Sequence, residues 1–336
     1  MNDVDIEKKM REFQVPGLSF STVRNAMIQE TVVKGVLEAG TDRNVNESSL
    51  FNACSMSKWT AAMLVLKLVG EGTLSLDEEV NYYLQGDDHE DYSPITLRSL
   101  LSHQAGFIDP PKSFGEYESR YGRPAIDDLL AGKTVYCQEQ IYPKVSPGEK
   151  FIYTDAGFCF LQYMIEKITG ESFETVVEQK IFTPLQMNHS QITSSPEQCT
   201  DKMACGHDSS GKRLEEKFSI YPYPAAAGLW SSSDDLAKLL VEVMKAVSGK
   251  GKLGIPQESA KEMVTSQGCS EWTGLGVFID PSGDLLEISS LGWGAGYQSL
   301  MAAYPFAGRG AIVMTNADLG VHQLEGLIGE ILPHIL

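Results

Sequence analysis

FNACSMSKWTAAMLVLKLVG, residues 51–70, is the stretch that decides the fold. Between Trp59 and Val69 its apolar residues recur at spacings of three and four, which is typical of one face of a helix. Gly70 and Gly72 end the pattern. We therefore expect a helix that begins near Ser55 and ends near residue 70.

Ser55 and Lys58 are predicted to share a face of this helix, because residues three apart are neighbours on a helix surface. The Lys58 ammonium can then reach the Ser55 hydroxyl, and free N–H groups at the helix N-terminus can stabilise developing negative charge. A serine needs a base to take its proton, and a lysine is that base only if burial or nearby cations lower its pKa. The pair is a candidate nucleophile and base.

The same spacing also has an ordinary structural interpretation. Ser-x-x-Lys occurs again at Ser209 and Lys212, in what reads as an exposed turn. A helix-capping serine and a solvated lysine explain Ser55 and Lys58 as well. Spacing alone leaves both interpretations open.

The composition of the chain limits the kinds of partner that it can bind. The chain has 336 residues, 42% of them hydrophobic, which is enough for a substantial core in one large domain or two interlocked ones. Its 45 acidic and 27 basic residues give a net charge of −18, which repels nucleic acid and anionic membrane surfaces. We expect neither a nucleic-acid partner nor a membrane partner.

The start of the chain and its cysteines indicate a compartment. Residues 1–9, MNDVDIEKK, are charged and lack the apolar core of a signal peptide, and no later stretch is long and apolar enough to span a bilayer. The six cysteines are too sparse for a disulfide framework, so reduced thiols are expected. We expect a cytoplasmic protein, unless a leader has been removed.

One group of residues needs a check for metal binding. Cys199, Cys205, His207 and Asp208 are close in sequence, but their spacing matches no zinc pattern and no second ligand pair follows. We expect no metal site and no organic cofactor.

Strand signals are confined to the two ends of the chain. Strands are expected at 17–23, 30–37, 274–279, 284–290, 297–304 and 310–315. Helices are expected at 3–13, 96–102, 155–168, 173–181 and 319–332, besides the one that begins at Ser55. Strands at both ends must pair across the helical middle.

This arrangement predicts the fold class. We expect an α/β protein of the α+β type, in which helices flank an antiparallel sheet. The sheet domain is predicted to be discontinuous, with residues 1–60 and 211–336, and residues 61–210 to form a mostly helical domain.

Two further stretches complete a pattern. Tyr153 lies on a loop that leads into a helix, two residues before Asp155, and a glycine-rich run extends from Ser290 to Ser299. With Ser55-Met56-Ser57-Lys58 as Ser-x-x-Lys and Tyr153-Thr154-Asp155 as Tyr-x-Asn, the chain resembles the serine β-lactamase and penicillin-binding-protein-like superfamily. It is similar to class C β-lactamases, their esterase relatives and D-alanyl-D-alanine peptidases over nearly its whole length. Supporting stretches follow in the family's order at 100–107, 181–187 and 227–236.

The resemblance implies a β-lactamase-like fold with the active site between the two domains. It implies that Ser55 attacks a carbonyl and forms an acyl-enzyme, while Lys58 and Tyr153 act as proton shuttles. His103 lies in the family's Leu-Leu-Ser-His stretch, and we interpret it as a structural histidine rather than a base.

The third motif of the family, Lys-Thr-Gly or His-x-Gly on a strand beside the nucleophile, has two registers here. We prefer Ser290-Leu291-Gly292, and Trp293-Gly294-Ala295 is the alternative. Both registers lack the cation with which the family binds a substrate carboxylate. In the preferred register the backbone N–H groups of Ser55 and Trp293 are expected to hold the oxyanion.

The candidate substrate-binding and oxyanion residues are therefore Asp155, Ser290, Gly292 and Trp293. Asp155 replaces the family's asparagine and, with the missing cation, makes the pocket less cationic. This favours an ester, an amide or another uncharged acyl donor over a β-lactam or a D-Ala-D-Ala peptide. Loops 105–125 and 265–275 are predicted to line the cleft.

Three functions fit these residues. The first is a serine hydrolase acting on a small-molecule or peptide acyl donor, and the second is an acyltransferase that uses the same acyl-enzyme. The third is a non-catalytic scaffold, against which the intact Ser55, Lys58 and Tyr153 argue. The sequence does not indicate the oligomeric state.

Overall fold

The computed structural model describes residues 5–336 except 85–91, 93, 282 and 284. Four residues of the charged segment 1–9 thus lie outside the described part. Among the described residues, none of the helices is both long enough and apolar enough to cross a bilayer.

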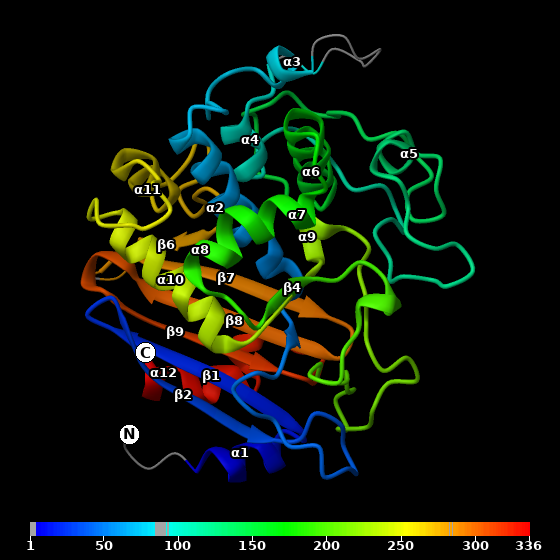
Figure 1. The fold of residues 1–336 in the computed structure, drawn as a ribbon, viewed down its shortest axis with the longest axis vertical. Coiled ribbons are helices and arrows are strands. Elements are labelled where there is room, and N and C mark those ends of the chain that lie inside the picture. Colours follow the sequence, from blue (N-terminus) through cyan, green and yellow to red (C-terminus); the bar gives the residue numbers. More distant parts are fainter. Residues whose placement is uncertain (1–4, 85–91, 93, 282, 284) are drawn as a thin grey trace.

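Six antiparallel strands form the main sheet in the order β2-β1-β9-β8-β7-β6 (Figure 1). The strands are β1 Gly17–Arg24, β2 Met27–Gly35, β6 Phe278–Asp280, β7 Glu287–Gly294, β8 Tyr297–Tyr304 and β9 Arg309–Thr315. The N-terminal hairpin joins the C-terminal strands through β1 and β9, where Leu18 lies opposite Thr315. The predicted pairing across the middle of the chain is confirmed.

Helices cover the sheet and extend above it. They are α1 Ile6–Glu12, α2 Ser57–Gly70, α3 Val80–Tyr83, α4 Leu97–Leu101, α5 Ile126–Leu130, α6 Ala156–Thr169, α7 Phe173–Val177, α8 Thr183–Leu185, α9 Pro224–Ala227, α10 Ser233–Ala246, α11 Gln257–Met263 and α12 Leu327–Ile335. The last helix begins later than the predicted residue 319, because Gly320 has a φ of +68° and the extended Gly326 precedes Leu327.

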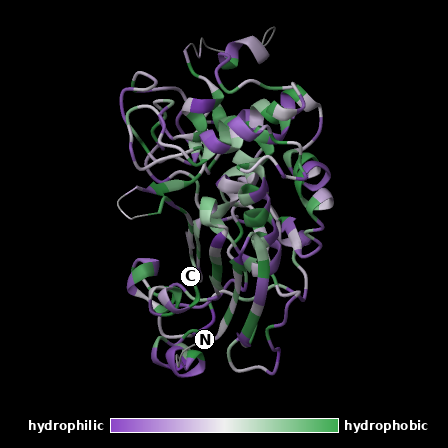
Figure 2. Cartoon of the chain, turned by 90° about the vertical axis from the view of Figure 1, so that its left-hand side faces the viewer, coloured by the Kyte–Doolittle hydropathy of each residue, from purple (hydrophilic) through white to green (hydrophobic). Residues whose placement is uncertain are grey.

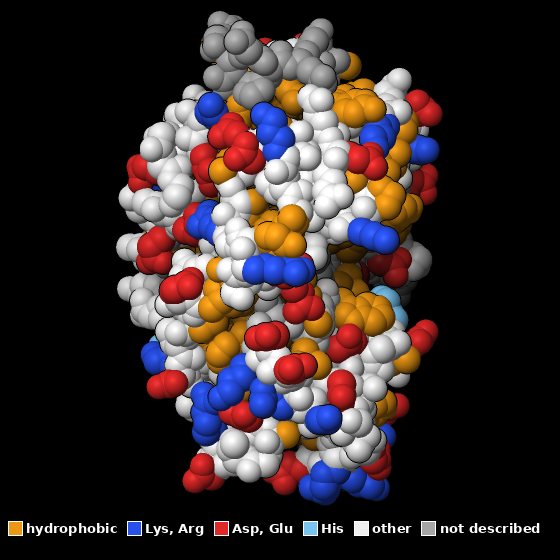
Figure 3. Space-filling view, turned by 90° about the vertical axis from the view of Figure 1, so that its right-hand side faces the viewer, with side chains coloured by type: hydrophobic (Ala, Val, Ile, Leu, Met, Phe, Trp, Pro, Cys, Tyr) orange, Lys and Arg blue, Asp and Glu red, His pale blue; other side chains and the backbone are white. Residues whose placement is uncertain are grey.

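The sheet is buried on both faces. In β9, Val313 packs into the cluster that contains α1 and α12 residues, whereas Met314 packs into the larger cluster that contains α2 and α10 residues. This alternation follows from the two-residue period of a strand. In Figure 2 the hydrophobic residues concentrate in the middle of the molecule, where sheet and helices meet. On the face drawn in Figure 3, acidic and basic side chains are interspersed.

The expectation that strands occur only at the two ends of the sequence is wrong. A second sheet has the order β3-β5-β4, with β3 Phe51–Asn52, β5 Leu229–Ser231 and β4 Ser190–Ile192. Strands of two or three residues are too short for an alternating pattern, so only their pairing partners define them. β4 belongs to the range predicted as helical, and the division into domains 1–60 with 211–336 and 61–210 stays a prediction.

Two strand predictions near the site also need correction. β6 begins at Phe278 rather than at 274, because Gly276 adopts a φ of +72° that interrupts the extended chain. β7 continues past the predicted residue 290, because its pairing with β8 extends to Gly294 and Tyr297. The glycine-rich run is therefore in large part a strand.

Candidate active site

Ser55 lies on a tight turn at the start of α2. Residues Cys54–Met56 form one 3₁₀ turn directly before the helix, and Cys54 has a φ of +48°, a left-handed conformation that is uncommon for a residue with a side chain. Asn52 accepts the Cys54 N–H at 2.8 Å, and the Ser57 hydroxyl donates to the Cys54 carbonyl at 2.6 Å. These bonds hold the backbone on both sides of Ser55 in one conformation.

Lys58 is one helical turn further on and is almost fully buried, with 3% of its surface exposed. Its Nζ donates to Ser55 Oγ at 3.1 Å and to the Ala226 carbonyl at 2.9 Å, and it forms an ion pair of 2.6 Å with Asp155 Oδ1. Lys58 is thus neither solvated nor free, and the helix places its ammonium on the hydroxyl of Ser55.

The charge of Lys58 depends on its burial and on its two polar neighbours. Burial alone lowers the pKa of its ammonium, but the Asp155 carboxylate and Tyr153 outweigh burial and raise that pKa above its ordinary value. A raised pKa favours the protonated form of Lys58 over the neutral form that a free base requires. Lys58 is a cation at neutral pH.

Tyr153 is positioned by His103. The imidazole stacks on the Tyr153 ring with centroids 4.4 Å apart, its Nδ1 accepts the Thr154 N–H at 3.3 Å, and the His103 carbonyl accepts the Ile152 N–H at 2.8 Å. Burial, and secondarily the charge of Lys58, lower the pKa of His103 to about 3. The imidazole is therefore neutral at ordinary pH and acts on the loop that carries Tyr153.

Asp109 anchors the other end of the same loop. Its carboxylate accepts the backbone N–H groups of Asp155 and Ala156, each at 2.9 Å, and the hydroxyl of Thr154. A carboxylate in this place satisfies free N–H groups at the start of α6 and complements the helix dipole. Burial and the neighbouring Asp155 raise the pKa of Asp109, against the opposing effect of these hydrogen bonds.

β7 passes very close to the turn that carries Ser55, at Gly292. A Cβ added at this glycine would lie 2.2 Å from the Ala53 carbonyl oxygen and 2.3 Å from Ser299 Oγ, so no larger residue fits. Ser290, which is buried, and Leu291 face one pocket together with Ser55, Lys58 and Tyr153. The close approach therefore brings the edge of β7 to the side of Ser55.

The residues of the alternative register, Trp293-Gly294-Ala295, do not face the pocket around Ser55. The Ala295 N–H donates to the Tyr221 hydroxyl at 3.0 Å, so this donor is already engaged. The Trp293 side chain is 44% exposed and donates through Nε1 to Asp318 at 2.8 Å. It is absent from the residues that line the pocket around Ser55, so only the backbone of Trp293 is a candidate for the oxyanion site.

The pocket itself is narrow and largely apolar. Beside the residues named above it is lined by His103, Thr273, Gly276, Val277 and Phe278. The predicted loop 265–275 contributes Thr273, whereas residues of loop 105–125 are absent from this lining and reach the site indirectly through Asp109. Within the described part of the chain, Lys58 is the one cationic side chain of the lining.

Sequence reasoning missed Asp109 and Phe278. Asp109 stands before two prolines in an irregular loop, 46 residues from its partner Asp155, and no local pattern links the two. Phe278 was assigned to a strand but not to the site.

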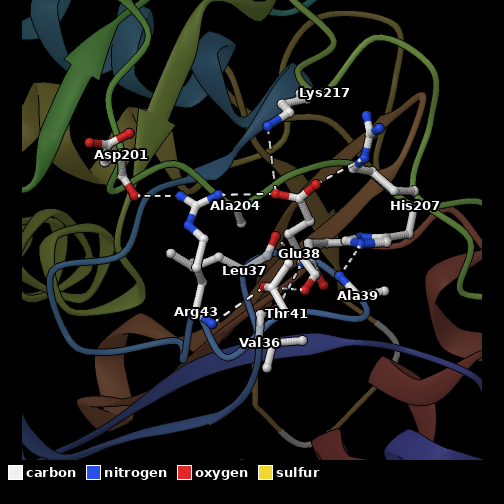
Figure 4. Close-up of polar contacts among 12 residues, drawn as sticks. Val36, Leu37, Glu38, Ala39, Thr41, Arg43, Asp201, Ala204, His207 and Lys217 are labelled. Atoms are coloured by element: carbon white, nitrogen blue, oxygen red, sulfur yellow. Dashed lines mark hydrogen bonds and ion pairs between the residues drawn. The ribbon is translucent and has the colours of Figure 1, made fainter.

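His207, the histidine of the cluster checked for metal binding, is held by backbone contacts (Figure 4). The His207 Nδ1 lies 2.7 Å from the Asn316 carbonyl oxygen, and its Nε2 accepts the Ala39 N–H at 3.0 Å. Both ring nitrogens are thus used by the backbone. Glu38 beside it forms ion pairs with Arg43 at 3.3 Å and Arg213 at 3.0 Å. Among the described residues, no group of three or more potential ligands could hold a metal ion.

The chain is similar in sequence to a known protein family and to several curated proteins. A family model described as Beta-lactamase matches residues 3–329. Penicillin-binding protein 4 of Amycolatopsis lactamdurans is 30% identical over 199 residues, which are 58% of this chain and 49% of that protein. A putative D-alanyl-D-alanine carboxypeptidase of Escherichia coli K12 is 24% identical over 257 residues, 68% of this chain and 58% of that protein. The chain thus matches only about half of the length of these curated relatives.

One solved structure matches this chain over almost the full length of both proteins. The crystal structure of a penicillin binding protein from Bacillus halodurans has a TM-score of 0.77 and 19% identity, and the match covers 98% of each chain. At this identity the match shows the fold, and the predicted β-lactamase-like fold class is confirmed.

Proposed function

The chain belongs to the Beta-lactamase family, and from that membership we propose that it is a serine hydrolase that forms an acyl-enzyme through Ser55. The observation that carries the proposal is the contact of 3.1 Å between Lys58 Nζ and Ser55 Oγ in a pocket that Tyr153 also lines. A relative named as a carboxypeptidase supports hydrolysis as the reaction class.

Tyr153 fits the role of proton shuttle better than Lys58, because Lys58 is already protonated. We infer that the Ser55 oxygen attacks the carbonyl carbon while its proton passes to the Tyr153 oxygen and the Tyr153 proton passes to the leaving oxygen or nitrogen. The bond between the carbonyl carbon and the leaving group breaks, and an acyl-serine remains. Water then attacks this ester along the reverse proton path and releases the acid.

In this mechanism the charged side chains of Lys58 and Asp155 transfer no proton themselves. The Lys58 ammonium donates to the Ser55 oxygen and stabilises negative charge on it, and Asp155 keeps Lys58 protonated. The backbone N–H groups of Ser55 and Trp293 are proposed to hold the oxyanion. Ser290 and Leu291 line the pocket beside Ser55, whereas Trp293, Gly294 and Ala295 are absent from its lining, and this supports the register Ser290-Leu291-Gly292 over the alternative one.

The proposed substrate is an uncharged ester or amide. Lys58 is the cation of the described pocket lining, and Asp155 already neutralises it. Ser290 stands where the family has a cation for a substrate carboxylate. A substrate carboxylate buried here lacks a free cationic partner, and burying an unpaired charge is costly.

The test is covalent labelling. Intact-protein mass spectrometry after treatment with a fluorophosphonate is expected to show one adduct per chain, and Ser55→Ala is expected to abolish it. Ser209→Ala is the matched control, because Ser209 repeats the Ser-x-x-Lys spacing on an exposed turn and labelling is expected to be unchanged. Absence of any adduct on folded protein supports the scaffold instead. Transfer of the acyl group to an added amine in preference to water supports the acyltransferase.

A further inference from the structure

Ser290 lies on the face of β7 that is turned toward the nucleophile. Side chains alternate along a strand, so Ser290 shares its face with Ile288 and Gly292. Ile288 packs into the cluster that contains α2 residues, and a Cβ at Gly292 would meet the Ala53 carbonyl oxygen. Ser290 itself is only 5% exposed and belongs to the lining of the pocket around Ser55. Its side chain therefore points into this pocket.

The hydroxyl of Ser290 has no hydrogen-bond partner among the residues that the structure describes. Buried polar groups in folded proteins are nearly always hydrogen-bonded, because an unpaired one costs free energy. Two other buried serines near the site follow this rule. Ser57 donates to the Cys54 carbonyl at 2.6 Å, and Ser299 donates to the Ala53 carbonyl at 3.4 Å. The Ser290 hydroxyl is thus available to a molecule that enters the pocket.

The pocket has room for a very small molecule. Its volume is about 20 Å³, and a cavity of about 10–15 Å³ already holds one water molecule. A buried water also needs about two to four polar partners. Ser55, Tyr153 and Ser290 all belong to the lining, and each carries a hydroxyl. The pocket therefore fits one water beside the nucleophile.

Hydrolysis of the acyl-serine requires two acceptors for the attacking water, one for each of its protons. In the proposed mechanism the Tyr153 oxygen takes the proton that the water loses. The second proton stays on the water oxygen and needs an acceptor that orients the water toward the acyl carbon. Lys58 does not supply this acceptor, because an ammonium only donates. The hydroxyl oxygen of Ser290 does accept.

Two more polar side chains of the described lining, His103 and Thr273, are already engaged. The His103 Nδ1 accepts the Thr154 N–H, so the neutral imidazole carries its proton on Nε2 and donates there. The Thr273 hydroxyl donates to the Gly274 carbonyl at 3.4 Å. Ser290 therefore offers the acceptor that no described residue already uses.

We propose that Ser290 binds the water that hydrolyses the acyl-enzyme. The proposal rests on Ser55 being the nucleophile. The water donates a hydrogen bond to Ser290 Oγ, its other proton passes to the Tyr153 oxygen, and the Tyr153 proton passes to Ser55 Oγ. A bond forms between the water oxygen and the acyl carbon, the bond from this carbon to Ser55 Oγ breaks, and the carboxylic acid leaves. The cation that the family has in this place lacks an acceptor, whereas the serine supplies one.

The test measures acylation and deacylation separately in Ser290→Ala. The protein is treated with p-nitrophenyl acetate, excess reagent is removed, and the loss of the acetyl adduct is followed by intact-protein mass spectrometry. Ser290→Ala is expected to slow this loss about tenfold or more, because the water loses one of the two groups that orient it. The rate of labelling by a fluorophosphonate is expected to change by less than about twofold, since the departing fluoride has no proton to donate to Ser290.

Ser289→Ala is the matched control. Ser289 is the neighbouring residue of β7 and its side chain lies on the opposite face, so both rates are expected to remain unchanged.

The outcomes separate the proposal from the function on which it rests. An acetyl adduct that decays as fast in Ser290→Ala as in wild type overturns the proposal. A labelling rate that falls by the same factor as deacylation also overturns it, because Ser290 then shapes the whole site. Wild-type protein that reacts with the fluorophosphonate but releases no acetate refutes the water site alone, whereas protein that reacts with neither reagent refutes the nucleophile as well.

Discussion

At the scale of single residues, Asp155 decides the charge of the site. Its carboxylate contacts the Lys58 ammonium at 2.6 Å in a place where solvent barely reaches Lys58. A buried ammonium without this partner loses its proton more readily, because burial disfavours the charged form. In the proposed mechanism, the residue that replaces the family's asparagine therefore keeps Lys58 protonated and leaves the proton transfer to Tyr153.

Asp155→Asn is expected to shift the pH dependence of the reaction. The carboxylate raises the pKa of Lys58, so its removal lets Lys58 lose its proton at lower pH. If the charged form supports the reaction, the variant loses rate on the alkaline side at a lower pH than wild type, whose rate is expected to hold up to pH 10. The rate constant for fluorophosphonate labelling between pH 6 and 10 measures it.

Glu149→Gln is the matched control, because Glu149 is an exposed carboxylate on the same loop and its removal is expected to leave the profile unchanged. A variant Asp155→Asn that reacts faster than wild type near pH 7 contradicts the mechanism. It would mean that neutral Lys58 is the base.

At the scale of elements, the contact between β7 and the 3₁₀ turn Cys54–Met56 positions the site. Gly292 allows the strand to touch the residue before this turn, and the Gln323 side chain donates to the Gly292 carbonyl at 2.9 Å from the other side. The strand therefore has little room to move away from Ser55.

Gly292→Ala is expected to separate the strand from the nucleophile. The new Cβ meets the Ala53 carbonyl oxygen, so β7 must shift, and overpacking of this kind costs about 1–3 kcal/mol of stability. The labelling rate is expected to fall at least tenfold, since a displaced Trp293 N–H no longer reaches the oxyanion. Labelling kinetics and urea unfolding measure the two effects.

Gly115→Ala serves as the control for Gly292→Ala. A Cβ at Gly115 meets no atom within 4 Å, and rate and stability are expected to stay near wild type. A wild-type labelling rate in Gly292→Ala would show that β7 does not supply the oxyanion donor.

At the scale of the whole molecule, the two ends of the chain close one sheet. Asn316, fully buried after β9, accepts the Gly17 N–H at 2.6 Å and donates to the carbonyls of Val36 at 3.2 Å and Leu37 at 3.3 Å. One amide thus connects the C-terminal strand to both ends of the N-terminal hairpin.

Asn316→Ala is expected to destabilise the fold without touching the pocket. It leaves the buried Gly17 N–H and the Val36 carbonyl without this partner, whereas the Leu37 carbonyl keeps the Cys205 N–H, and each unsatisfied group costs about 1–3 kcal/mol. We expect a loss of about 3 kcal/mol in the free energy of unfolding, measured in urea. Gln138→Ala removes an exposed amide and is expected to change stability by less than about 0.5 kcal/mol. A similarly small change in Asn316→Ala would contradict the structural role of this residue.

The sequence by itself determined the fold class and the helix that carries Ser55 and Lys58. The spacing of apolar residues fixes α2, and the motif order predicts that Tyr153 follows on a loop before α6, because these features are local in the chain. The structure brings Ser55, Lys58, Tyr153, Asp155 and Ser290 together. The family assignment made from these motifs is confirmed by the match over residues 3–329.

Only the tertiary structure decided the second sheet, the anchor at Asp109 and the ion pair between Lys58 and Asp155. β3, β4 and β5 have two or three residues each and exist through pairing across the chain. Asp109 and Asp155 are 46 residues apart, and Lys58 and Ala226 are 168 apart. The pKa of a side chain likewise depends on its burial and on every charge nearby. Such properties arise from contacts between distant residues, which no local pattern encodes.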